Sequence, residues 1–235
     1  MDKLTVIVPA AGAGKRMGLG HNKAFALLQG IPLLVHCLTM IKRTGLAAEA
    51  IVVVGAGEIA QAEDLLRPYQ TKLLQGLSYR FVAGGKERQD SVANALAVIT
   101  DTEGYVAVHD GARPFAGTKV FADTLAAAKV TGAAIAAVPV KDTIKVLDDR
   151  GLVAATPDRS LLRAVQTPQI FEINLLRRAY AYLKEHPVAV TDDASLVELL
   201  GRKVAVAPGH YENIKLTTPE DLVWAEALLK KRKMY

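Results

Sequence analysis

The sequence has few of the features that mark secreted, disulfide-rich or membrane proteins. Its 235 residues include one cysteine, Cys37, which cannot form an internal disulfide, as is typical of proteins in a reducing compartment. No apolar run approaches the ~20 residues of a membrane-spanning helix. The first residues, MDKLTVIVPAAG, lack the basic start and long apolar core of a secretory signal. We therefore expect a cytoplasmic protein.

Several familiar catalytic patterns are also missing. The sequence shows no Ser-His-Asp set, no cysteine in a nucleophile motif and no His/Cys cluster with zinc-ligand spacing. Aromatic residues make up only 6% of the chain, but hydrophobic residues make up 51% and charged residues 23%, which is typical of a folded globular protein. The sequence therefore predicts a folded protein that does not work through these chemistries.

The positive charge of the chain is concentrated at its C-terminal end. The formal net charge is +5, from 29 Lys and Arg against 24 Asp and Glu. Four of the cations form the run Lys230-Lys231-Arg232-Lys233, and without them the balance is 25 − 24 = +1. Such a run favours a solvated last helical turn over a nucleic-acid site, because cations complement the negative end of a helix dipole.

Apolar, β-prone runs alternate with segments of helical spacing, which predicts an α/β protein. Continuous rather than alternating apolar strands indicate burial on both faces, hence a mostly parallel sheet with helices on both sides, a Rossmann-like three-layer fold. The predicted strands lie at 4–10, 50–56, 79–84, 105–111, 133–140 and 203–209. In the first helical segment, Leu34, Cys37, Leu38 and Ile41 share one face and Gly45 provides a stop.

One segment interrupts this alternation. Residues 141–171 hold the turn signal DDRG between β-prone runs, so we expect a hairpin-like arm that leaves the sheet. No internal repeat and no long linker divides the chain. We expect a single domain over residues 1–235 with a protruding arm.

Candidate binding residues follow the first predicted strand, where ligands of open parallel sheets bind. The sequence PAAGAGKRMG places small residues, whose backbone N–H groups can approach phosphate oxygens, beside Lys15 and Arg16. Its glycine spacing matches neither a dinucleotide-binding loop nor a P-loop. With Lys23 shortly after, these residues predict a polyphosphate site.

Three further segments carry candidate residues. GGKERQDSV, after the third strand, offers Arg88 and Ser91 for hydrogen bonds to a flat ligand, and VHDGARP places Asp110 at a strand end near Arg113, which suits a carboxylate that holds Mg²⁺. His109 should point away from Asp110 and be packed.

Lys215, in an apolar-flanked extended segment, needs an anion: either an Asp or Glu, or a substrate phosphate. Cations at several strand ends with one or two carboxylates predict phosphoryl or nucleotidyl transfer.

Eight sequence blocks in this order resemble the 2-C-methyl-D-erythritol 4-phosphate cytidylyltransferases of the non-mevalonate isoprenoid pathway. The resemblance covers essentially the whole chain. The blocks are PAAGAGKRM, NKAF with LLQGIPLL, GGKERQDSV, VHDGARP, PVKDTIK, TPDRSLLRAVQTPQIF, VTDDASLVE and ENIKLTTPEDL. In some relatives Asp stands where this chain has Lys86 and Glu212.

The resemblance implies a reaction between CTP and methylerythritol phosphate that yields the CDP-alcohol and pyrophosphate with Mg²⁺. It places Arg16, Lys23 and Lys215 in catalysis on the triphosphate, and Asp110 near the metal and the alcohol phosphate. It also implies a homodimer, in which Arg159 on the arm reaches the site of the partner chain, and no nucleic acid or membrane partner. The implied nucleotide-binding residues are Ala10, Ala11, Gly12, Ala13, Gly14, Gly85, Lys86, Arg88 and Ser91, and the implied alcohol-phosphate contacts are Asp110, Arg113, Arg159, Thr167 and Thr191.

Two other functions stay open from the sequence. A ribitol 5-phosphate cytidylyltransferase would share the nucleotide site and differ only in a few contacts to hydroxyl groups. A nucleotide-binding module without catalysis would bind CTP but would have little need for cations that converge on the α-phosphate.

Overall fold

A seven-stranded sheet forms the centre of the molecule. The computed structural model describes residues 4–12, 14 and 22–232. The strand order is β11-β7-β10-β6-β1-β4-β5, and neighbours run parallel except β10, which is antiparallel to both β6 and β7. The mostly parallel sheet is therefore confirmed. Its strands are β1 (Leu4–Pro9), β4 (Ala47–Val54), β5 (Tyr79–Ala83), β6 (Tyr105–Val108), β7 (Ala133–Pro139), β10 (Arg163–Glu172) and β11 (Ala205–Pro208).

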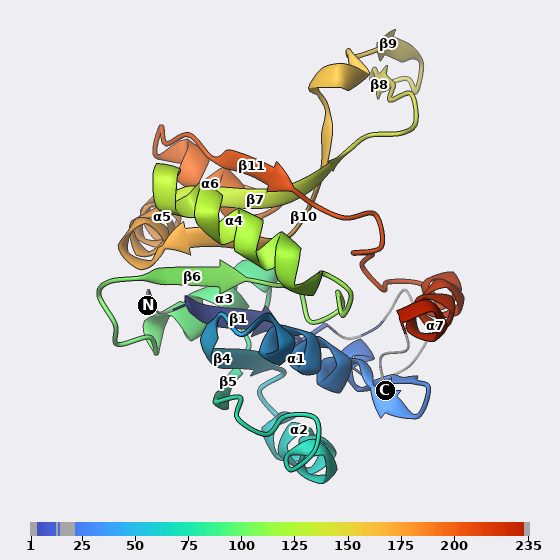
Figure 1. Cartoon of the computed structure of the whole chain (residues 1–235). Helices are drawn as coiled ribbons and strands as arrows, with labels where there is room; N and C mark the ends of the chain where they lie inside the picture. The colour runs from blue at the N-terminus through green and yellow to red at the C-terminus, as the bar shows by residue number, and fades with distance from the viewer. Residues whose placement is uncertain (1–3, 13, 15–21, 233–235) are drawn as a thin grey trace.

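Helices cover both faces of this sheet (Figure 1). Successive side chains of a strand point to opposite faces, so Val6 and Val8 of β1 belong to one core and Ile7 to the other. Burial on both faces explains the continuous apolar runs in the sequence. One core includes α1 (Leu33–Thr44), α2 (Ile59–Leu66) and α4 (Gly117–Thr131), and the other includes α3 (Arg88–Ala97), α5 (Ile173–Glu185) and α6 (Asp193–Leu199).

The first helix follows its sequence pattern closely. Leu34, Cys37, Leu38 and Ile41 are all fully buried in α1. Gly45 ends the helix with a φ of 67°, a left-handed conformation that glycine adopts without steric cost.

A smaller core forms around the last helix, α7 (Pro219–Arg232), and the hairpin of β2 (Leu27–Leu28) and β3 (Ile31–Pro32). The sequence predicted that the basic end of α7 is solvated, but two of its cations are paired with a carboxylate. Lys231 and Arg232 form ion pairs with Glu212 at 2.6 and 2.8 Å, and Lys233 lies outside the described residues. Two cations of the basic run therefore connect α7 to the chain segment before it.

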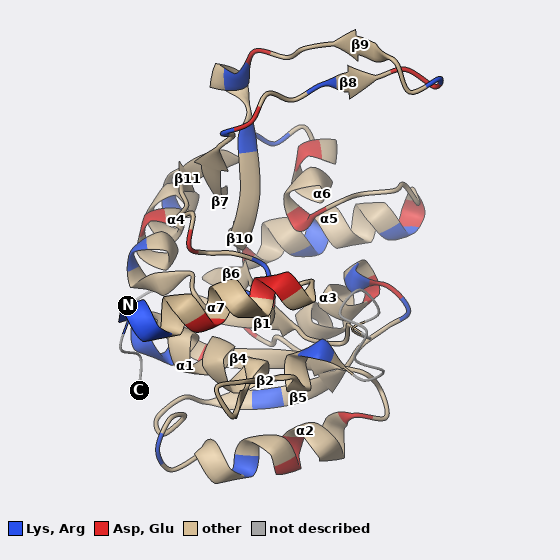
Figure 2. Ribbon diagram, turned by 90° about the vertical axis from the view of Figure 1, so that its right-hand side faces the viewer, with Lys and Arg blue, Asp and Glu red and all other residues tan. Residues whose placement is uncertain are grey.

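The arm stands clear of the sheet and carries β8 (Val146–Leu147), β9 (Val153–Ala155) and the short 3-10 helix η4 (Arg159–Leu161) (Figure 2). Asp148 closes the hairpin, since its backbone carbonyl accepts from Gly151 N–H and its carboxylate accepts from Leu152 N–H. The predicted arm, 141–171, is too long. Residues 163–172 form β10 inside the main sheet because the apolar pair Ile170 and Phe171 is fully buried between the helical layers.

Among the described residues, no helix combines the length and apolar character that crossing a bilayer requires.

Candidate active site

A cavity of about 410 Å³ opens where β1, β5 and β6 end. Because the carboxyl ends of parallel strands meet at one edge of a sheet, this is where a ligand of the fold is expected. Sequence motifs that are far apart along the chain meet in its wall. The lining residues are Pro9, Ala10, Ala11, Gly12, Lys23, Ala24, Gly85, Lys86, Glu87, Arg88, Ser91, Asp110, Gly111, Ala112 and Lys215.

Asp110, in this wall, lies among three cations, of which Arg88 and Lys215 also line the cavity. Its carboxylate is 2.8 Å from Lys215 Nζ, 3.6 Å from Arg88 Nε and 3.6 Å from Arg113 Nε. Burial alone would raise the pKa of this carboxyl, but the three cations, led by Lys215, outweigh burial and hold the pKa well below its usual range. The cluster is therefore an ionised carboxylate in an excess of positive charge, which suits an anionic ligand.

Thr167 holds the backbone at Asp110 and also contacts the preceding residue, His109. The Thr167 hydroxyl accepts from Asp110 N–H at 3.0 Å and lies 3.1 Å from His109 Nδ1. His109 Nε2 lies 2.9 Å from the Arg113 carbonyl, which can only accept, so Nε2 carries the proton and Nδ1 accepts from Thr167. Burial lowers the pKa of His109 to about 4. His109 is packed, as predicted, and its low pKa leaves it neutral at pH 7.

Lys215 is held beside Asp110 by the segment that carries it. The fully buried Asn213 donates through Nδ2 to the Thr167 carbonyl at 2.8 Å and to Gln166 Oε1 at 3.1 Å, and Leu216 N–H donates to the Ala112 carbonyl at 2.9 Å. The sequence left two kinds of anionic partner open for Lys215. In this structure its partner is a carboxylate, that of Asp110.

Lys23 also lines this cavity. It begins the 3-10 helix η2 (Lys23–Phe25), its N–H donates to the Gly12 carbonyl, and its Nζ lies 3.4 Å from the Leu216 carbonyl. Lys23 and Lys215 therefore meet at one cavity. Ala13 and Arg16 lie outside the described residues, so the convergence of Arg16 on this site stays a prediction.

Gly85 and Ser91, two of the nucleotide-binding residues that the family resemblance implies, form a close-packed part of the wall. Gly85 N–H donates to Ser91 Oγ at 3.2 Å, and Ser91 Oγ donates to the Glu87 carbonyl at 3.1 Å. A Cβ at Gly85 would lie 2.2 Å from Asp90 Cβ, so a side chain at this position does not fit. At Gly85 the motif therefore presents only backbone to the cavity, and Lys86 and Arg88 line the cavity beside it.

Sequence reasoning missed the residues that hold Arg88. Asp193, 1% exposed, accepts from Arg88 at 2.7 Å and from the Tyr180 hydroxyl at 2.6 Å. The motif Thr191-Asp192-Asp193 offers two carboxylates, and nothing in the sequence tells which one faces inward. Asp192 caps α6 through Ser195 N–H instead.

Four of the predicted contacts for the alcohol phosphate do not line this cavity. Arg113 and Thr167 each contact Asp110, through an ion pair and a hydrogen bond respectively. Thr191 lines a hollow of about 90 Å³ next to Arg88. Arg159 is exposed on the arm, where its guanidinium donates to the Lys141 carbonyl at 2.6 Å. Within one chain, the arm does not bring Arg159 to the cavity.

Comparison with known proteins agrees with this geometry. The family model described as 2-C-methyl-D-erythritol 4-phosphate cytidylyltransferase matches residues 4–231. The chain belongs to this cytidylyltransferase family. A curated cytidylyltransferase from Bacillus mycoides (strain KBAB4) is 48% identical over 229 residues, which is 97% of this chain and 99% of the relative. One from Alkaliphilus metalliredigens (strain QYMF) is 44% identical over 233 residues, 99% of this chain and 95% of the relative.

Solved structures of the cytidylyltransferase family share the fold. The 4-diphosphocytidyl-2C-methyl-D-erythritol synthase from Anaerococcus prevotii superposes with a TM-score of 0.84 at 32% identity, covering 97% of this chain and 99% of the other. The cytidylyltransferase from Thermus thermophilus gives a TM-score of 0.77 at 36% identity, with the same coverage.

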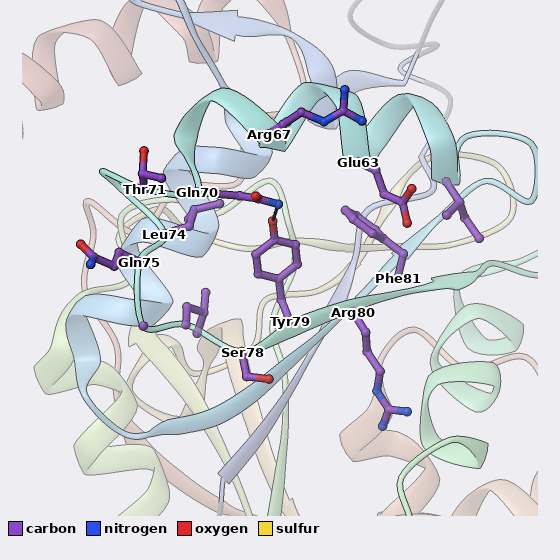
Figure 3. A pocket seen from close by; sticks show the side chains of 13 residues that line it. Glu63, Arg67, Gln70, Thr71, Leu74, Gln75, Ser78, Tyr79, Arg80 and Phe81 are labelled. Atoms are coloured by element: carbon purple, nitrogen blue, oxygen red, sulfur yellow. Dashed lines mark hydrogen bonds between the residues drawn. The ribbon is translucent and has the colours of Figure 1, made fainter.

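A larger hollow, of about 980 Å³, lies elsewhere in this family member, between α2 with the 3-10 helix η3 (Arg67–Tyr69) and the edge strand β5 (Figure 3). None of the predicted site residues lines it. We therefore base the choice of candidate site on the charged groups that converge at the strand ends and not on the volume of the hollow.

Proposed function

We propose that this chain transfers the cytidylyl group of CTP to 2-C-methyl-D-erythritol 4-phosphate. The cluster of Asp110, Lys215 and Arg88 in a cavity that also holds Lys23 carries this proposal. Such a cavity suits a triphosphate, since several cations face it from different elements. The family membership supplies the identity of the two substrates.

The reaction needs positioning and charge stabilisation rather than a covalent intermediate. A phosphate oxygen of the alcohol phosphate attacks the α-phosphorus of CTP, the bond between the α-phosphorus and the bridging oxygen breaks, and pyrophosphate leaves. Lys23 and Lys215 would neutralise charge that develops on the α-phosphate and the leaving group, together with Arg16. The backbone at Ala10–Gly12 and Gly85 would bind the nucleotide.

Asp110 fits a role in holding Mg²⁺. Among the described residues, no three His, Cys, Asp or Glu side chains form a ready-made metal site. Mg²⁺ in nucleotide enzymes is often held by one or two carboxylates, with substrate phosphates and water completing its shell, so one ionised carboxylate in the cavity suits it. When bound, the ion supplies additional neutralisation of the triphosphate.

We further propose that two chains form a homodimer through the arm, and that Arg159 reaches the alcohol phosphate in the partner chain. The arm exposes apolar side chains, with Leu161 80%, Leu152 62% and Val153 60% exposed. Exposed apolar surface of this kind is typical of a protein interface.

A cytoplasmic location stays a prediction.

The decisive test is turnover with defined substrates. Purified protein is incubated with CTP, Mg²⁺ and either methylerythritol phosphate or ribitol 5-phosphate, and pyrophosphate release is measured, with EDTA as the metal-free control. We expect faster turnover with methylerythritol phosphate and none with EDTA. Faster turnover with ribitol 5-phosphate would reject the substrate, and CTP binding without turnover would reject catalysis.

A further inference from the structure

A hydrogen-bonded cluster joins the start of α2 to the loop after β1, outside the cavity described above. Glu58 Oε2 accepts from Gly55 N–H at 2.8 Å and from Asn22 Nδ2 at 2.7 Å. Asn22 Nδ2 also donates to the Ala10 carbonyl at 2.6 Å, and Asn22 Oδ1 accepts from Ala24 N–H at 3.0 Å. Asn22 thus connects the start of α2 with the loop after β1 and with η2.

The Glu58 side chain does not cap the helix that it precedes. Glu58 is the N-cap residue of α2, but its side chain makes no cap hydrogen bond there. Asp, Asn, Ser and Thr are the side chains suited to that capping role. A Cβ at Gly55 would lie 2.7 Å from Glu58 Oε2, so the absence of a side chain at Gly55 leaves room for the carboxylate. The geometry therefore directs Glu58 towards Asn22.

Asn22 in turn fixes two parts of the cavity wall. It is 2% exposed, and its hydrogen bonds hold Ala10, which lines the cavity, and the first turn of η2, which begins with Lys23. Lys23 N–H also donates to the Gly12 carbonyl. A lysine has a long, flexible side chain, so the place of its Nζ depends on how firmly its backbone is held.

We propose that Glu58 is a positioning residue for Lys23 and acts through Asn22. This inference rests on the proposed function, in which Lys23 neutralises charge on the triphosphate. A carboxylate that accepts two N–H groups forms stronger hydrogen bonds than a neutral acceptor. It therefore holds the Asn22 amide in the orientation that serves Ala10 and Ala24 together.

Steady-state kinetics of Glu58→Ala test this role. We expect kcat to fall roughly 10- to 100-fold, the range that misplacement of a catalytic group produces, with an unchanged KM for the alcohol phosphate. Glu58→Gln keeps an oxygen acceptor and should retain activity within about fivefold of the parent, because neutral hydrogen bonds are weaker but present. Unchanged kcat in folded Glu58→Ala overturns the proposal.

Glu63→Ala is the matched control, since it removes a carboxylate from the same helix. Glu63 lines the hollow between α2 and β5 (Figure 3), and neither Asn22 nor Glu58 lines that hollow. Its kcat should equal that of the parent. If Glu58→Ala does not fold, Gly55→Ala replaces it, because a methyl group there displaces the Glu58 carboxylate while the carboxylate itself remains in the chain.

A double-variant comparison separates positioning of Lys23 from a general structural effect. In a Lys23→Ala background, Glu58→Ala should cause no further loss of kcat. A further loss as large as that in the parent overturns the proposal.

CTP affinity, measured by calorimetry, gives a readout that does not depend on turnover. A parent protein that binds CTP without turnover contradicts the proposed function. Glu58→Ala should still weaken CTP binding, and should not weaken it further in the Lys23→Ala background. CTP affinity that Glu58→Ala leaves unchanged would count against the positioning role.

Discussion

At the scale of single residues, Asp110 provides the counter-charge that allows Lys215, Arg88 and Arg113 to lie close together. Removing one partner of a buried ion pair leaves the others uncompensated. Asp110→Asn should therefore lower the free energy of unfolding by roughly 2–4 kcal/mol, a loss of roughly 4–16 °C in Tm for a domain of this size.

Thermal unfolding followed by circular dichroism measures this loss. Asp123→Asn is the control, because Asp123 forms an ion pair with the exposed Lys119 at the surface of α4. Such pairs contribute at most about 1 kcal/mol, so the control should unfold near the parent temperature. Equal Tm values for the two variants would contradict the central role of Asp110.

Lys215 belongs to the same cluster but acts on the ligand in the proposed reaction. Lys215→Ala should lower kcat roughly 10²- to 10³-fold, the usual effect of removing one group that stabilises transition-state charge, with the fold retained. Pyrophosphate release measures kcat, and Lys203→Ala, at an exposed position outside the cavity, is the control. Unchanged kcat in Lys215→Ala would remove this residue from the mechanism.

At the scale of elements, α7 is tied to the preceding segment through Glu212. Hydrogen bonds from Lys231 and Arg232 lower the pKa of Glu212 to about 2. A carboxyl whose pKa is lower in the folded than in the unfolded state stabilises the fold above its unfolded value near 4.5, and this contribution disappears as the pH falls towards 2. The ion pairs should therefore matter at neutral pH and lose their effect in acid.

Glu212→Gln tests this tie. Its Tm should lie roughly 2–4 °C below that of the parent at pH 7, since a partly exposed ion pair contributes at most about 1 kcal/mol, and the difference should shrink as the pH drops below 4.5. Glu226→Gln, on the exposed side of α7, is the control. A Tm difference that is independent of pH would contradict the ionic origin.

The elements themselves were largely predictable, but their order and their contacts were not. Apolar runs located the strands because burial on both faces leaves a strong signal. The place of β10 in the middle of the sheet has no such signal, because only residues 166–171 of the strand are buried and its first three residues continue the exposed arm. Likewise, Arg88 and Asp193 meet across 105 positions of sequence, a distance at which local patterns carry no information.

The candidate site was predictable where a motif carries the chemistry itself. Asp110, Lys23 and Lys215 stand in recognisable blocks and meet at one cavity. Asn213 and Glu58 do not line the cavity but form hydrogen bonds with residues next to its lining. An amide or a carboxylate in a loop is common in any sequence, so neither residue stands out as part of a site. Such supporting residues become visible only when the backbone brings them together.

At the scale of the whole molecule, the arm exposes its apolar side chains and carries Arg159 away from the cavity of its own chain. If sites are shared between subunits, a heterodimer of an Arg159→Ala chain with an Arg16→Ala chain contains one complete site out of two. Activity should then return to about half that of the parent dimer.

Heterodimers isolated through two different affinity tags measure this recovery. Ultracentrifugation should first show a particle of twice the 25.1 kDa chain mass. Homodimers of either variant are the controls and should stay inactive. No recovery in verified heterodimers would contradict donation of Arg159 across the interface.

The antiparallel strand β10 also has a consequence for the assembly of the chain. In the described structure, β7 and β11 are connected to the other four strands of the sheet only through β10. During synthesis, β1, β4, β5 and β6 can pair once residue 108 is available, whereas β7 must wait for residues 163–172 before it has a neighbour on that side. The topology thus allows one part of the sheet to form before the rest, and the two parts can join into a single folded body only when β10 has been synthesised.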